Sequence, residues 1–256
     1  MYLGSYFYFV SIQEDRFKSR QLLSDYTFEF ETPFEEFNLK PEDGALINSL
    51  LFKADSSVGV VCFWKGNGGA LDNWGKVASL FTQVGYDVAI TDYRQHGKSK
   101  GSISMDSFYS DAQLVYDFLK TRYPEGKITL VGYSLGTAIA SYLSAGNSPQ
   151  KVILIDPKVN FEARSLDSFF FLFPSVNKFP FQPKKYIEQT DESVVVICGK
   201  QGNLYADALS LKSVMKKSDC FFEIADADHR TILGHSELTK LLHQILNDDE
   251  KSQSCF

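Results

Sequence analysis

The stretch KITLVGYSLGTAIA, residues 127–140, contains an apolar run, then Gly-Tyr-Ser-Leu-Gly, then a series of small residues. The apolar run predicts a buried strand, and the residues after the serine predict a helix. A sharp strand-to-helix turn strains its central residue and leaves no room for bulky neighbours. Gly132 and Gly136, two residues to either side of Ser134, provide that room. The pattern predicts a nucleophile elbow that exposes the Ser134 hydroxyl at a helix N-terminus; a structural turn serine is the alternative.

Strand-like and helix-like segments alternate along the rest of the chain. Short apolar, β-branched runs bounded by turn residues are typical of parallel strands covered on both faces. Their alternation with helical patterns predicts a doubly wound α/β fold. We expect strands at 34–39, 46–53, 58–63, 87–92, 128–132, 151–155, 194–198 and 219–225, and helices at 71–84, 106–122, 135–145, 205–216 and 231–246.

This order predicts a single α/β domain over residues 1–256, with a mostly parallel sheet of about eight strands and helices on both faces. The first two strands, joined through PEDG, form an antiparallel hairpin at one edge. Residues 157–193 show no single clean helix, and we interpret them as a Phe-rich insertion or lid over the carboxyl edge of the sheet. The polar segment 248–256 is expected to be a C-terminal tail.

Composition excludes some partners. The net charge of −6 and a pI of about 5.3 give no basic face for nucleic acid. No apolar run approaches the roughly 20 residues of a transmembrane helix, and the apolar start MYLGSYFYFV lacks the features of a signal peptide. The four cysteines are scattered without metal-ligand spacing, which indicates free thiols in a reducing compartment and no metal site. We therefore expect a cytoplasmic protein, with peripheral membrane contact left open and its oligomeric state undetermined.

A nucleophilic serine needs a base within hydrogen-bond reach, and the chain has four histidines. His229 follows the last predicted strand, so it should lie at the same carboxyl edge as Ser134. His96 also follows a strand, in the loop DYRQHGKSKG, whereas His235 and His243 fall within the last helical pattern. We therefore predict that His229 is the base.

An acyl-transfer site also needs hydrogen-bond donors for a developing oxyanion. The N–H of Leu135, directly after the serine, should be one donor. The second should come from the loop WKGNGGALDNW, whose glycines allow close approach of the backbone to a ligand. Asn67 is the preferred second donor, and Gly68 is the alternative. A phosphate-binding loop is disfavoured because the spacing matches neither common phosphate motif.

Taken in order, these pieces resemble the α/β-hydrolase superfamily. The resemblance is to the compact group that contains small lipid and acyl-protein hydrolases and S33-type peptidase homologues. It covers about residues 28–247 and includes PEDGALINSLLF, KGNGGALDNW, DYRQHGKSKG, GYSLG and DADH. The resemblance implies that Ser134 and His229 are catalytic, and that Arg94 and His96 stabilise the loop that carries them.

The chain departs from that family pattern at two positions. The oxyanion loop of the family commonly opens with His-Gly, where this chain has Lys65-Gly66. The family acid commonly follows the strand at 194–198 as Gly-x-x-Asp, and here Gly202 takes the place of the Asp.

The sequence offers several replacements for the missing acid, which would hold the imidazole in the right tautomer. Asp156 ends the neighbouring predicted strand at the same edge, and we place the acid there. Asp207, Asn203 or no acid at all are the alternatives. Asp228 adjoins His229 in sequence and should point elsewhere.

These features predict a serine hydrolase of carboxylic esters or thioesters that acts through an acyl-enzyme on Ser134 and needs no cofactor. The expected partner is a small-molecule ester or acyl substrate. Its acyl group should be apolar if the insertion lines the pocket, although the same aromatic side chains could instead pack into the core. The alternative is a weak or inactive binding or scaffold protein on this fold, and a peptidase is a further rival. The aromatic residues of the 157–193 insertion that could line the pocket are Phe161, Phe169, Phe170, Phe171, Phe173, Phe179 and Phe181.

Overall fold

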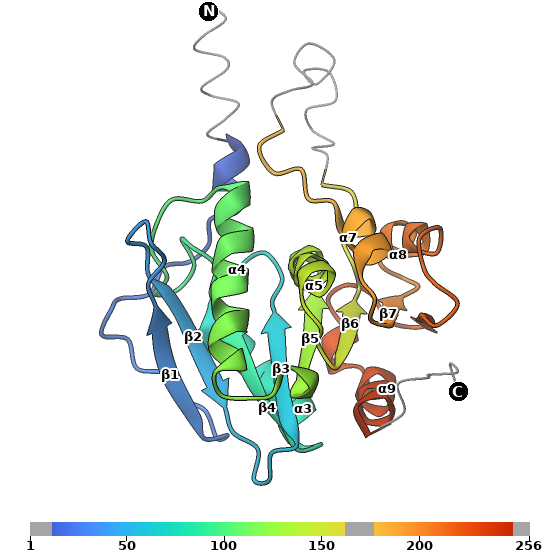
Figure 1. Ribbon diagram of the computed structural model, residues 1–256, viewed down its shortest axis with the longest axis horizontal. Coiled ribbons are helices and arrows are strands. Elements are labelled where there is room, and N and C mark those ends of the chain that lie inside the picture. The colour runs from blue at the N-terminus through green and yellow to red at the C-terminus, as the bar shows by residue number, and fades with distance from the viewer. Residues whose placement is uncertain (1–11, 162–176, 248–256) are drawn as a thin grey trace, which may run out of the picture.

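The computed structural model describes residues 12–161 and 177–247. An eight-stranded sheet forms its centre (Figure 1), with the strand order β1-β2-β4-β3-β5-β6-β7-β8. The strands are β1 (Phe34–Leu39), β2 (Ile47–Phe52), β3 (Gly59–Trp64), β4 (Tyr86–Thr91), β5 (Ile128–Tyr133), β6 (Lys151–Ile155), β7 (Val194–Gly199) and β8 (Cys220–Ile224).

The pairing follows the predicted hairpin and parallel core. β1 pairs with β2 and β2 with β4 in antiparallel fashion, while every other neighbouring pair is parallel. The fold class is therefore confirmed. Each predicted strand is present, with its ends displaced by no more than one residue.

Helices cover both faces of the sheet and enclose two apolar cores. Alternate residues of each central strand face opposite layers, so that Val60 and Cys62 contribute to one core and Val61 and Phe63 to the other. In Figure 1, α4 and α5 lie in front of the sheet. The helices are α2 (Leu71–Trp74), α3 (Ser79–Thr82), α4 (Met105–Lys120), α5 (Leu135–Gly146), α7 (Pro183–Gln189), α8 (Tyr205–Leu211) and α9 (Ser236–Asn247).

Some helical predictions need correction. The segment 71–84 is not one helix, because a 3₁₀ turn at Gly75–Ala78 separates α2 from α3. Gly75 lies so close to Phe30 that an added Cβ would come within 2.3 Å of the ring. α8 ends at Leu211, earlier than predicted, and α9 begins only at Ser236.

The interval 157–193 contains a helix that its pattern did not predict. α7 begins with Pro183 in its first turn and buries Ile187 in the core beside α5. Of the insertion's aromatic residues, Phe179 and Phe181 are buried in that core, and Phe161 packs against it. Phe169–Phe173 lie outside the described residues. The boundaries of the domain, of the insertion and of the C-terminal tail stay predictions.

The cysteines only partly follow the expected pattern. Cys62 and Cys198 are free and buried, whereas Cys220 is disulfide-bonded. Sequence spacing did not reveal this bond, because distance along the chain does not report distance in space. None of the described helices is both long and apolar enough to cross a membrane. The cytoplasmic location stays a prediction.

Candidate active site

The Ser134 turn has the strained geometry that the flanking glycines implied. Ser134 adopts φ 54° and ψ −116° between β5 and α5, a conformation that side-chain-bearing residues rarely take. A Cβ on Gly132 would lie 2.4 Å from the carbonyl oxygen of Gly136. A Cβ on Gly136 would lie 1.9 Å from the carbonyl oxygen of Trp64. Only glycine fits at these two positions, because the close neighbours are backbone atoms that cannot rotate away.

His229 and Asp156 meet at the same edge of the sheet. The Nδ1 atom of His229 forms a short hydrogen bond with the Oδ2 atom of Asp156. Asp156 is fully buried directly after β6, and its other oxygen accepts the Gly199 N–H at 3.2 Å. The side chain of His229 is 29% exposed, so one face of the imidazole is accessible. A buried carboxylate at Nδ1 leaves Nε2 as the nitrogen that can take up a proton.

The structure separates the other candidate acids from His229. The Oδ2 atom of Asp207 accepts the N–H groups of Val159 and Asn160, at 2.9 Å each. Asp228 accepts backbone N–H groups within its own turn. The contact between Asp156 and His229 is thus the arrangement that we preferred from the sequence.

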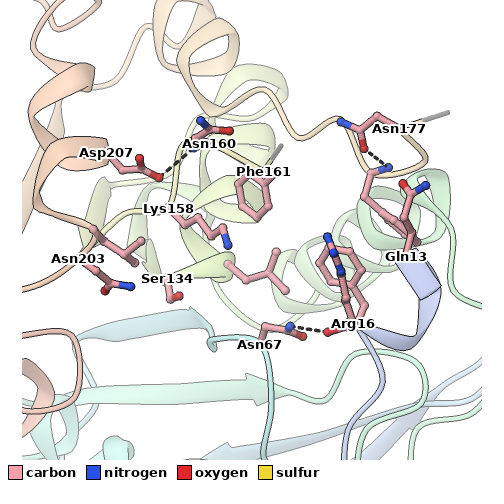
Figure 2. A pocket seen from close by; sticks show the side chains of 14 residues that line it. Gln13, Arg16, Asn67, Ser134, Lys158, Asn160, Phe161, Asn177, Asn203 and Asp207 are labelled. Carbon is pink, nitrogen blue, oxygen red and sulfur yellow. Dashed lines mark hydrogen bonds between the residues drawn. The ribbon is translucent and has the colours of Figure 1, made fainter. Parts of the chain in front are cut away.

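A cavity of about 600 Å³ opens at Ser134 (Figure 2). Both predicted oxyanion donors, Leu135 and Asn67, line it beside the serine. Leu135 is the first residue of α5, so its N–H has no acceptor within the helix. The Asn67 side chain donates to the Arg16 carbonyl at 2.7 Å. The remaining lining residues are Gln13, Arg16, Phe17, Lys158, Asn160, Phe161, Asn177, Phe179, Asn203, Leu204 and Asp207.

The serine and the imidazole are not joined directly. Within residues 12–161 and 177–247, no hydrogen bond links the Ser134 hydroxyl to His229, and His229 is not among the lining residues of the cavity. Such contacts are often long without substrate and tighten in the reactive complex.

Comparison with known proteins identifies the family. A family model described as alpha/beta hydrolase fold matches residues 59–192, just over half of the chain. The chain belongs to the alpha/beta hydrolase fold family.

Curated relatives of this chain include proteins named lysophosphatidylserine lipase ABHD12. The chain is 27% identical to the Xenopus tropicalis protein over 229 residues, which is 77% of this chain and 59% of that protein. It is 34% identical to the Danio rerio protein over 119 residues, which is 43% of this chain and 31% of that protein. The chain therefore spans less than two thirds of the length of these relatives.

Solved structures share the hydrolase fold across most of the chain. The esterase Pf2001 of Pyrococcus furiosus superimposes with a TM-score of 0.69 at 19% identity, covering 90% of this chain and 96% of that one. The thioesterase domain from the curacin biosynthetic pathway gives 0.61 at 15% identity, covering 82% and 99%. At these identities, the likeness establishes the fold alone.

Lys65 supports the loop that follows β3, the loop predicted to supply an oxyanion donor, at the position where the family pattern commonly has histidine. The Nζ atom of Lys65 is fully buried and donates to the Gly69 carbonyl at 3.3 Å and to Nδ1 of His96 at 2.8 Å. Asp92 lies 3.4 Å from the same nitrogen. Burial lowers the pKa of Lys65 to about 8 despite the Asp92 charge, and burial beside Lys65 lowers the pKa of His96 to about 3. Neutral His96 can then donate from Nε2 to the Phe17 carbonyl at 2.7 Å.

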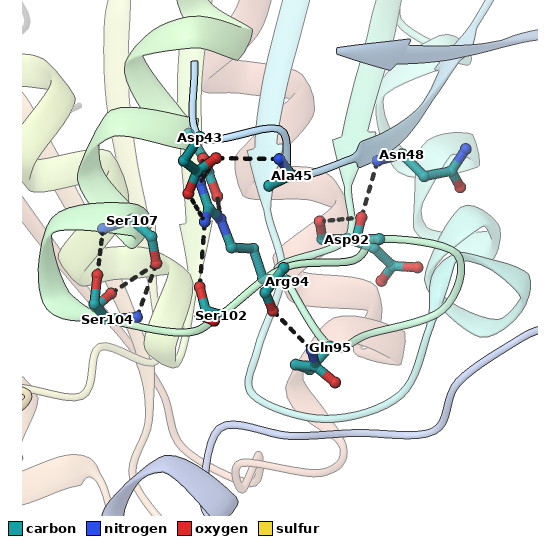
Figure 3. Close-up of polar contacts among 12 residues, drawn as sticks. Asp43, Ala45, Asn48, Asp92, Arg94, Gln95, Ser102, Ser104 and Ser107 are labelled. Atoms are coloured by element: carbon teal, nitrogen blue, oxygen red, sulfur yellow. Dashed lines mark hydrogen bonds and ion pairs between the residues drawn. The ribbon is translucent and has the colours of Figure 1, made fainter. Parts of the chain in front are cut away.

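Arg94 anchors the DYRQHGKSKG loop to α4, as expected for a structural residue. Its guanidinium donates to Asp111 at 2.7 and 2.8 Å, and it also bonds Asp43 and the Ser102 carbonyl (Figure 3). These partners raise the pKa of the buried Arg94, so its charge is permanent.

Three residues at the candidate site were not predicted from the sequence. The Tyr133 ring stacks on His229, with ring centroids 4.9 Å apart, and its hydroxyl donates to the His229 carbonyl. Its position inside the Gly-Tyr-Ser-Leu-Gly motif was the available signal. Lys158 and Arg16 also reach the cavity. Lys158 follows Asp156 by two residues, but nothing in the sequence placed Arg16 near Ser134.

Proposed function

We propose that this chain is a serine hydrolase of carboxylic esters or thioesters with an apolar acyl group. The observation that carries the proposal is the buried carboxylate of Asp156 on the imidazole of His229, at the sheet edge where Ser134 occupies its strained turn. Nucleophile, base and orienting acid follow β5, β8 and β6 respectively, in an arrangement that supports acyl transfer.

In the proposed acylation step, the Ser134 hydroxyl oxygen attacks the acyl carbon while Nε2 of His229 takes its proton. Asp156 stabilises the imidazolium that forms. The N–H groups of Leu135 and Asn67 would hold the negative oxygen of the tetrahedral intermediate. Its collapse breaks the bond to the alcohol or thiol, which leaves with the proton from His229.

Deacylation repeats the sequence with water. The neutral imidazole of His229 takes a proton from water, the hydroxide adds to the acyl carbon on Ser134, and collapse releases the carboxylic acid. The serine oxygen recovers its proton from the imidazolium. No step requires a group from outside the chain and its substrates.

The cavity and the named relatives support an acyl substrate. The half-buried side chains of Phe161 and Leu204 provide apolar surface for an acyl chain. The curated relatives carry the name lysophosphatidylserine lipase. Gly202 and Lys65 favoured the scaffold alternative. The contact between Asp156 and His229 supports the hydrolase proposal, because it offers a carboxylate to the imidazole although Gly202 occupies the usual acid position.

A fluorophosphonate probe tests the proposal, because it phosphonylates activated serines. We expect stoichiometric addition at neutral pH, mapped by peptide mass spectrometry to Ser134. Ser134→Ala should abolish labelling and ester hydrolysis. Ser141→Ala is the matched control, since Ser141 lies buried in the same helix and bonds the Thr137 carbonyl. Labelling of Ser134→Ala at the wild-type rate, or no labelling of folded wild-type protein, would contradict the proposed mechanism.

A further inference from the structure

We propose that the cavity at Ser134 contains an anion-binding subsite formed by Lys158 and Arg16. It would take a phosphate or carboxylate group carried near the ester bond of the substrate. This inference rests on the proposed function and narrows its substrate class. In Figure 2 the Lys158 ammonium points into the space between Phe161 and Ser134.

The charge of the cavity lining is opposite to that of the whole chain. Arg16 and Lys158 line the cavity, and Asp207 is the one carboxylate among the described lining residues. The Oδ2 atom of Asp207 is engaged by two backbone N–H groups. The lining therefore carries a net positive charge in a protein of net charge −6. A concave site with net positive charge raises the local concentration of anionic ligands.

Lys158 forms no ion pair with any carboxylate in the described part of the chain. Its side chain is partly buried, and no described carboxylate lies within ion-pair distance. Its ammonium lies 5.4 Å from the centre of the Phe161 ring. By contrast, Lys178, which lies in the same 157–193 interval, forms an ion pair with Glu14. Withdrawing a cation from water without a counter-ion is unfavourable, so a ligand that brings the anion would bind preferentially.

The neutral lining suits the same kind of ligand. Amide side chains supply N–H donors for phosphate or carboxylate oxygens, while the aromatic side chains suit an acyl chain. The cavity is thus amphipathic, as an ester with one anionic and one apolar half would require. The amides that carry this argument are Asn177 and Asn203.

Three octanoyl esters with the same acyl chain test the subsite. They are 1-octanoylglycerol, its 3-phosphate and the octanoyl ester of glyceric acid. We expect wild-type kcat/KM to be roughly tenfold higher for the two anionic esters, the scale of a hydrogen bond to a charged group. Lys158→Gln should bring the ratio of anionic to neutral kcat/KM close to one, and Arg16→Gln should lower it in part. Added salt should reduce the wild-type ratio.

Matched variants distinguish the effect of the charge of Lys158 in the cavity from the effect of the net charge of the protein. Lys158→Arg keeps the cation and should keep the preference. Lys240→Gln removes a charge from α9, outside the described lining of the cavity, and should leave the ratio unchanged. A wild-type ratio near one, or a ratio that Lys158→Gln does not change, would overturn the subsite.

Calorimetric binding of n-octyl phosphate distinguishes failure of the subsite from failure of the hydrolase proposal, because it needs no turnover. We expect Kd to rise roughly tenfold in Lys158→Gln and to be unchanged in Lys240→Gln. If no ester is hydrolysed but this pattern holds, the hydrolase proposal fails and the subsite stands. If octyl phosphate binds wild type and Lys158→Gln equally, or binds neither, the subsite is wrong whatever the hydrolysis data show.

Discussion

Asp156 combines three constraints in one residue. Its backbone has φ 46°, an unusual value for a residue with a side chain. Its N–H donates to the Ile197 carbonyl at 2.7 Å, and its carboxylate contacts both the Gly199 N–H and His229. Such strain persists only where surrounding contacts determine it, and it concentrates at functional sites. The buried carboxylate of Asp156 is itself held by the Gly199 N–H, and it therefore fixes the orientation of the His229 imidazole.

Asp156→Asn should test this role. The amide is isosteric, but it presents a neutral group to Nδ1 and favours the wrong imidazole tautomer. We expect a folded protein whose kcat for ester hydrolysis is lower by up to about 10⁴-fold. Steady-state kinetics with a p-nitrophenyl ester, together with circular dichroism of the same samples, would measure both properties.

Asp228→Asn is the matched control for that substitution. Asp228 adjoins His229 in sequence, but its side chain accepts the N–H groups of Arg230 and Thr231. An amide oxygen can accept the same hydrogen bonds, so the rate should stay within a few-fold of wild type. Equal losses in the two variants would contradict the assignment of Asp156.

At the scale of elements, α5 lies so close to β3 that their contact leaves no space for a side chain at Gly136. The helix follows Ser134 directly and packs against β3, β5 and α7. Gly136 is where the helix backbone meets the end of β3, at the carbonyl of Trp64. This close approach places Leu135 beside the oxyanion loop, which continues from β3 through Lys65.

Two alanine substitutions in α5 test the importance of this close approach. Gly136→Ala should lower the free energy of unfolding by about 3 kcal/mol or more, since its Cβ would lie 1.9 Å from backbone oxygen. Gly146→Ala, at the exposed end of the same helix with no atom within 4 Å of the added Cβ, should change it by at most about 1 kcal/mol. Urea unfolding measures both. Similar effects for the two variants would show that Gly136 is not tightly packed.

At the scale of the whole molecule, a buried polar cluster joins segments that are distant in the chain. Lys65 follows β3, while Asp92 and His96 follow β4, and His96 continues the network to the Phe17 carbonyl. The Leu71 N–H donates to Asp92 at 3.1 Å. The N-terminal segment, the oxyanion loop and the start of α2 are therefore held together by one set of hydrogen bonds.

Titration of this cluster should change the stability of the whole protein. Lys65 has a pKa of about 8 when folded and about 10.4 when unfolded. Between these values the unfolded chain binds more protons, so the contribution of Lys65 to the free energy of unfolding rises with pH. Wild type should therefore gain stability relative to Lys65→Met between about pH 8 and pH 10, measured by urea unfolding at each pH. Parallel stability curves would contradict a depressed pKa.

Much of this architecture could be predicted because its signals are local. The run ITLVG, its glycine-flanked serine and the small residues after it were sufficient to predict β5, the turn and α5. A strand that is buried on both faces needs a continuous apolar sequence, and this pattern can be recognised without knowing which strands pair with it. The sequence also predicted that Ser134, Asp156 and His229 lie at one edge, since the carboxyl ends of parallel strands meet there.

Only the tertiary structure decided among residues whose local patterns were equivalent. Asp156, Asp207 and Asp228 are all acidic residues near strand ends. Asp207 and Asp228 accept backbone N–H groups elsewhere, whereas Asp156 contacts His229. The segment 71–84 is helical by periodicity, but the close contact of Gly75 with Phe30 accompanies its break. The positive lining of the cavity comes from Arg16 and Lys158, which are 142 positions apart in the chain. Such outcomes depend on long-range contacts, and those exist only once the chain has folded.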